Sequence, residues 1–139
     1  MIYETQVQFI TIDANGNDRV VKQKFIVKEA ASHGEAEDFT FSECQSQTDI
    51  DVIAVKRSKI KEILNNRTND NERIFIADVA DVMTDDNGEE KELIYKMVFF
   101  AANADAAYNY IKAYLAQGYN MSLVGLKMTK FVDVIGQYC

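Results

Sequence analysis

The sequence of 139 residues has no proline, no tryptophan and only two cysteines. Without proline, chain reversals must depend on glycine, asparagine and aspartate. No run of 18 apolar residues occurs, so we expect no helix that crosses a membrane. The first residues lack the basic segment and the uninterrupted apolar segment of a signal peptide. We therefore expect a cytoplasmic protein.

Chemistry-bearing motifs are equally scarce. Cys44 and Cys139 have neither a CxxC partner nor a nearby histidine, which excludes a disulfide framework and a zinc site and predicts two reduced thiols. The only histidine, His33, falls in the first turn of a predicted helix, a poor place for a catalytic base. Phosphate-binding loops, GxSxG and HExxH are absent. We expect no catalytic residue, no metal and no cofactor.

Carboxylates are plentiful, but their spacing does not indicate a metal site. Asp78 and Asp81 lie three apart in a predicted strand and would point to opposite faces. The segment from Asp85 to Gly88 lacks the alternating ligands of a calcium loop, so we interpret it as a turn. We expect a protein that binds and is not an enzyme.

Charge of one sign dominates: 22 acidic against 15 basic residues give a net charge of -7. A generally basic nucleic-acid-binding protein is excluded, because no overall positive field would attract phosphate. A local basic face remains compatible with this balance.

The two halves of the chain resemble each other at an offset of 71 or 72 residues. The turn at Asp13–Gly16 corresponds to Asp85–Gly88, and Ala30–Ser32 corresponds to Ala101–Asn103. The segment 52–64 then matches 123–135, with apolar, small, basic and acidic residues at nearly the same positions. Three matches in one order at one spacing predict an internal duplication.

Each copy shows the pattern strand, turn, strand, helix, strand. The strands are predicted near residues 3–12 and 20–27, then 93–100, and at 52–64 and 123–135. Asn-Gly at each turn is a strong hairpin signal. Ser32 with Glu35 forms a capping box for a helix over 32–43, and Asn103 caps a second helix over 104–117 that Gly118 would end.

The predicted fold class is α+β: two ββαβ units related by a pseudo-two-fold axis, with two helices packed on antiparallel sheet. The single domain would consist of repeat 1 (1–64), a polar linker (65–72) and repeat 2 (73–139). One such unit has unpaired edges and is marginal alone. The copies could join their sheets edge to edge or pack face to face, and the sequence does not decide between these.

Two segments carry a resemblance to a known family: Val27–Glu37 (VKEAASHGEAE) and Lys56–Ile63 (KRSKIKEI). With the second copy over 73–135, the chain resembles an uncharacterised family of Bacteroidetes and their phages, including crAss-like phages. The shared motifs are structural, so the resemblance transfers no catalytic residue. Its phage setting favours a role in nucleic-acid transactions by association only. If the gene is carried by a phage, the protein would lie in the cytoplasm of the bacterial host.

Basic residues recur at equal spacing in the two copies and provide the functional hypothesis. Lysines beside aromatic side chains on a sheet are typical of sequence-tolerant single-strand binding, where charge follows the backbone and rings stack on bases. The predicted nucleic-acid-binding residues are Lys22, Lys24, Lys56, Arg57, Lys59, Lys96, Lys127, Lys130, Tyr3 and Tyr95.

A second hypothesis needs no nucleic acid. Lysines and aromatic residues also occur on ordinary antiparallel sheets, where edge lysines deter aggregation. The chain would then be a protein-interaction or assembly module. A homodimer is compatible with either hypothesis.

Overall fold

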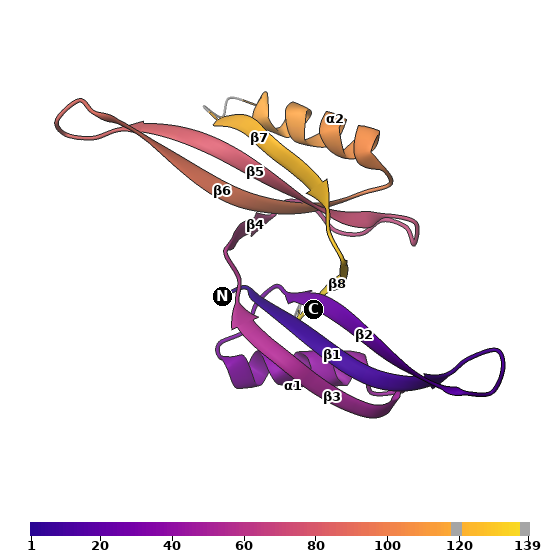
Figure 1. Ribbon diagram of the computed structural model, residues 1–139. Coiled ribbons are helices and arrows are strands. Elements are labelled where there is room, and N and C mark those ends of the chain that lie inside the picture. Colours follow the sequence, from indigo (N-terminus) through magenta and orange to yellow (C-terminus); the bar gives the residue numbers. More distant parts are fainter. Residues whose placement is uncertain (118–120, 137–139) are drawn as a thin grey trace. The chain divides into compact units, whose positions relative to one another are not determined.

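The computed structural model describes residues 1–117 and 121–136 and has a mixed α+β architecture (Figure 1). Its described residues form two helices and eight strands in two four-stranded sheets. In chain order the elements are β1 (Tyr3–Ile12), β2 (Asp18–Val27), α1 (His33–Glu43), β3 (Thr48–Arg57), β4 (Ile60–Ile63), β5 (Arg73–Thr84), β6 (Glu90–Ala101), α2 (Ala104–Leu115), β7 (Met121–Met128) and β8 (Phe131–Ile135).

The chain forms two compact units, each with one sheet and one helix. Unit 1 holds residues 1–59 and the chain from Lys130 onward, with strand order β3-β1-β2-β8. Unit 2 holds residues 60–129, with order β4-β6-β5-β7. β1, β2 and β3 of unit 1 occupy the same relative places as β5, β6 and β7 of unit 2. β8 of unit 1 then occupies the place that β4 has in unit 2. The compact units therefore differ from the sequence repeats in their last short strand.

The segments 52–64 and 123–135 are each two strands, where the sequence predicted one. The backbone N–H of Ser58 donates to the carbonyl of Ile2, and that of Thr129 donates to the carbonyl of Ile74, both at 2.9 Å. Beyond these bonds the chain leaves the antiparallel pairing. β4 then pairs in parallel with β6, and β8 in parallel with β2. The same break at equivalent positions supports the predicted duplication.

Both hairpin turns form as predicted and have matching hydrogen bonds. The Asp13 carboxylate accepts from the backbone N–H of Asn15 and Asn17, and the Asp85 carboxylate accepts from Asn87 and Glu89. Gly16 and Gly88 adopt φ of 80° and 79°, a conformation that L side chains rarely adopt. The Asn-Gly signal thus located both reversals.

Helix α1 covers one face of the unit 1 sheet. Ser32 caps it by accepting from the backbone N–H of Glu35, as predicted. The alternating residues of β1 and β2 point into this core, and Ala36 meets them from the helix. The core residues are Tyr3, Val7, Phe9, Phe25, Val27, Ala30, Ala36, Cys44 and Ile135.

Helix α2 packs in the same way on the unit 2 sheet. Asn103 caps it through the backbone N–H of Ala106, and the helix buries Ala107, Ile111 and Leu115 along one side. The predicted stop at Gly118 lies outside the described residues. Among those residues, no helix reaches the length and apolarity that crossing a membrane requires.

A pair of buried threonines joins α1 to β1. Thr40 Oγ1 donates to the carbonyl of Ala36, so Thr5 Oγ1 is the donor in its 2.6 Å bond to Thr40 Oγ1. We expect Thr40→Val to destabilise the protein by about 1–3 kcal/mol, because the Thr5 donor is left buried without a partner. The double variant Thr5→Val/Thr40→Val should cost less than Thr40→Val alone, as measured in urea by circular dichroism. Additive costs would contradict this coupling.

Gly136 lies directly after β8 and places this strand against the core. Its φ is +81°, and a Cβ would lie 2.8 Å from Val27 Cγ1. Gly16 has φ +80° but no heavy atom within 4 Å of its Cβ position, so it is the matched control. We expect Gly136→Ala to lower the free energy of unfolding by about 1–3 kcal/mol more than Gly16→Ala, because only the former adds overpacking to backbone strain. Equal losses of unfolding free energy for the two variants in urea titrations would show that β8 has room to shift.

Candidate nucleic-acid interface

The ten predicted contact residues divide between the two units. Unit 1 contains Lys22, Lys24, Lys56, Arg57, Lys59, Lys130 and Tyr3, whereas unit 2 contains Lys96, Lys127 and Tyr95. The repeated lysines therefore do not belong to one sheet. Each unit has to be judged by the surface that it presents itself.

In unit 1 the sheet face that points away from α1 is polar. Strand register places Gln6 beside Lys24 and Gln8 beside Lys22, while Lys56 lies beside Glu4 on the other side of β1. Since the core residues of β1 occupy the alternate positions, these side chains share the opposite face. We call this surface the open face: Glu4, Gln6, Gln8, Lys22, Lys24 and Lys56.

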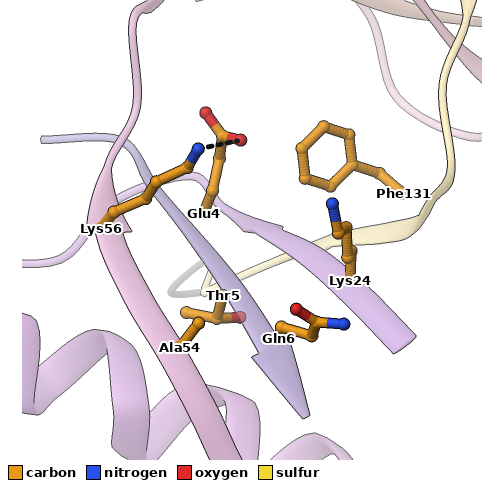
Figure 2. A pocket seen from close by; sticks show the side chains of 7 residues that line it. All are labelled: Glu4, Thr5, Gln6, Lys24, Ala54, Lys56 and Phe131. Carbon is orange, nitrogen blue, oxygen red and sulfur yellow. Dashed lines mark ion pairs between the residues drawn. The ribbon is translucent and has the colours of Figure 1, made fainter. Parts of the chain in front are cut away.

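A pocket of about 190 Å³ opens on this face (Figure 2). Figure 2 shows Lys56 and Glu4 on one side of it and Lys24 with Phe131 on the other. Phe131 comes from β8, which pairs with β2 at Lys24. The complete lining is Glu4, Thr5, Gln6, Lys24, Ala54, Lys56 and Phe131.

Acidic groups moderate the charge of the open face. Lys56 Nζ lies 3.9 Å from the carboxylate of Glu4, but 74% of the lysine side chain is exposed, so the attraction is weak. Glu4 also accepts a 2.8 Å hydrogen bond from the Ser58 hydroxyl. Asp51 lies opposite Gln8. The three lysines thus exceed the two acids by one charge, which predicts modest affinity for an anion.

Three further basic residues that were predicted as contacts are exposed but lie elsewhere in unit 1. Arg57 pairs with Tyr3 in the register and so belongs to the α1 side of the sheet. Lys59 and Lys130 lie in the two breaks of the chain, directly before β4 and β8. Lys59 and Lys130 are therefore not part of the open face.

Tyr3 corrects the sequence analysis. Its side chain is only 2% exposed and lies in the core under α1, with its ring 4.9 Å from the His33 ring in an edge-on arrangement. A base cannot stack on a ring that has no free face. We therefore remove Tyr3 from the candidate interface.

Unit 2 does not repeat the polar open face. Lys96 Nζ lies 3.0 Å from the Asp78 carboxylate, so its charge is compensated. Lys127 is exposed but lies opposite buried Ile76, and Ile76 pairs in turn with buried Val98. Where unit 1 has Gln6 and Gln8, unit 2 has Asp78 and Ala80, and the buried neighbours on this face are apolar.

Tyr95 is half-buried and already has a cationic neighbour. Lys61 Nζ lies 3.5 Å from the centre of its ring, within the range of a cation–π interaction. A base stacking on that side would have to displace Lys61. Tyr95 is therefore a weaker candidate than the sequence suggested.

Sequence reasoning missed Phe131, Gln6 and Gln8. The glutamines alternate with core residues along β1, so the alternation in the sequence could have shown that they share a face. Phe131 gave no such signal, because its place depends on the pairing of β8 with a strand more than 100 residues earlier in the chain.

Other reactive groups do not form a second site. The described residues contain no group of three or more His, Cys, Asp or Glu side chains suited to a metal ion. Backbone hydrogen bonds from Thr68 and Asn69 lower the pKa of Glu72, and burial raises the pKa of Tyr110. Glu72 closes the loop between β4 and β5. These shifts accompany structural contacts.

The chain belongs to a family described as a domain of unknown function, DUF4494, which matches residues 1–138. The resemblance to an uncharacterised family is thereby confirmed, whereas an origin in Bacteroidetes or their phages stays a prediction. No curated protein and no solved structure matches the chain. The function must therefore be argued from the chain itself.

Cys44 is a buried free thiol at the end of α1, and Cys139 lies outside the described residues. Burial, and secondarily the charge of Glu43, raise the pKa of Cys44. We expect iodoacetamide to modify Cys44 slowly at neutral pH, because both access and the thiolate fraction are low, and quickly in urea. Peptide mass spectrometry would measure the two rates. Fast labelling in the folded protein would contradict this arrangement.

Proposed function

We propose that the protein binds single-stranded nucleic acid through the open face of unit 1, as a binding protein without catalytic activity. The observation that supports this most directly is the alignment of Lys22, Lys24 and Lys56 on one helix-free sheet face. Single-strand binding needs cations along the backbone path and a ring on which a base can stack. The open face provides both, with Phe131 at its margin.

The arrangement suits a flexible strand better than a duplex. Lys24 and Lys22 follow one another on β2, while Lys56 lies two strands away across β1. A single strand can bend from one to the other and still avoid Glu4 and Asp51. Gln6 and Gln8 between them can both donate and accept hydrogen bonds to sugar or base edges.

The strength of binding follows from the few charges available. Three lysines make at most about three phosphate contacts, so log affinity should fall with log salt at a slope no steeper than about -2, from ~0.7 per contact. Such a surface binds weakly at physiological salt. Little sequence preference is expected, since charge and stacking do not read base edges.

Fluorescence anisotropy with a labelled 20-mer oligodeoxynucleotide at low salt tests the proposal. We expect Lys22→Ala/Lys24→Ala/Lys56→Ala to abolish measurable binding. The matched control, Arg73→Ala/Lys91→Ala/Lys112→Ala, removes three exposed basic side chains of unit 2 and should weaken binding far less. Equal losses of affinity in the two triple variants would show that only overall charge matters and would overturn the assigned face. No binding by the wild-type protein at tens of micromolar would overturn the proposed function.

Glu4 allows a test in which binding improves. Replacing it by glutamine removes a negative charge from the pocket and frees Lys56, so Glu4→Gln should bind the oligonucleotide a few times more tightly at low salt. Glu37→Gln on the exposed side of α1 is the control and should have a smaller effect. A gain of the same size in the control would contradict a local role for the pocket.

Phe131 separates stacking from charge. Phe131→Leu keeps an apolar side chain against β2 but removes the aromatic face, so we expect affinity to fall several-fold while the salt slope stays the same. Circular dichroism confirms that the variant is folded. Unchanged affinity would leave charge as the only contribution.

A further inference from the structure

The distal part of the β5–β6 hairpin is an exposed two-stranded ribbon. β7 pairs with β5 only as far as Asp81, and β4 pairs with β6 only from Lys96. Within the described residues, 82–84 therefore pair only with β6, and 90–94 pair only with β5. Figure 1 shows this ribbon extending past β7 and α2. We call residues 81–94 the β5–β6 arm.

Both faces of the arm expose large apolar side chains. Val82 and Ile94 are 46% and 49% exposed and lie diagonally across one face, and Met83 and Leu93 are 50% and 41% exposed and lie diagonally across the other. Diagonal neighbours on a sheet are within reach of one another. A two-stranded ribbon is marginal in water, and four exposed apolar residues on it indicate a surface that another molecule covers.

The arm is also strongly acidic. Its single basic residue is Lys91, and its acidic residues are Asp81, Asp85, Asp86, Glu89, Glu90 and Glu92. Asp85 is engaged in the turn, but Glu90 and Glu92 are exposed on β6. Alternation places Glu90, Glu92 and Ile94 on one face of the unpaired stretch of β6, with Leu93 on the other.

We propose that the β5–β6 arm binds a basic, apolar peptide segment of another protein in extended conformation, added as a strand beside β6. Backbone groups at a free strand edge give affinity in such complexes, and alternate side chains give specificity. The bound segment would carry basic residues opposite Glu90 and Glu92 and an apolar residue opposite Ile94. Opposite charges across adjacent strands stabilise such pairing.

Charge complementarity selects this occupant over a second copy of the chain. Two arms placed edge to edge would bring Glu90 and Glu92 of each copy against acidic neighbours, and like charges opposite one another on a sheet are destabilising. The whole protein also carries a net charge of -7. A lysine-rich or arginine-rich strand removes this repulsion and covers the apolar side chains.

The equivalent β1–β2 hairpin has the apolar residues without the acidic excess. Ile12 and Val20 are 71% and 56% exposed at its far end. Asp13 and Asp18 are balanced there by Arg19 and Lys22. We expect the basic peptide to discriminate between the two hairpins.

Anisotropy of a labelled ten-residue lysine–valine peptide, in which two lysines and then a valine occupy successive alternate positions, tests the proposal when the peptide is titrated with the full chain at low salt. We expect saturable binding that weakens with salt. Glu90→Lys/Glu92→Lys should lower the affinity at least tenfold, and Ile94→Ser should lower it several-fold. A peptide of alternating glutamate and valine should not bind.

The matched control is Glu37→Gln/Asp38→Gln, which removes two exposed acids from α1 and should bind the lysine–valine peptide nearly as the wild type does. Hydrogen exchange should show new protection at residues 90–94 and none over 18–22. No binding, equal losses in the α1 control, or protection at the β1–β2 hairpin would overturn the proposal. Self-association of the wild type through residues 90–94 in sedimentation and exchange measurements would assign the arm to a second copy instead.

Discussion

Parallel pairing of the fourth strand in each sheet is the constraint on which the architecture depends. A parallel neighbour cannot be reached by a hairpin, because the chain must cross over before it can run in the same direction. β2 receives β8, and β6 receives β4, each after an intervening stretch of chain. Neither ββαβ copy could provide this strand to its own sheet through the short breaks at Ser58–Lys59 and Thr129–Lys130. Each sheet thus includes a short strand from the other half of the chain.

Local signals in the sequence were enough for most of the elements. The Asn-Gly turns and the caps Ser32 and Asn103 are decided by residues close in the chain, and all of them form as predicted. The exchange of β4 and β8 was not predictable in this way. The breaks at Ser58–Lys59 and Thr129–Lys130 contain no glycine, asparagine or aspartate that would indicate a turn, and only distant pairing partners distinguish two strands from one.

The candidate interface shows the same division between local and distant information. Lys22 and Lys24 are two residues apart on β2, so alternation alone places them on a shared face. The burial of Tyr3 depends on α1, the neutralisation of Lys96 depends on Asp78, and the position of Phe131 depends on β8. Equal spacing in the sequence therefore did not give equal environments, since the residues beside each lysine differ between the copies.

The contribution of β8 to unit 1 has a consequence for the order in which the protein folds during synthesis. Unit 2 is continuous from Ile60 to Thr129, so all its strands are synthesised before β8. Unit 1 begins the chain but lacks its edge strand until Phe131–Ile135 emerge, and Ile135 then fills its place in the core. The part translated first is thus completed last. Until then β2 has an open edge that invites pairing with another nascent chain.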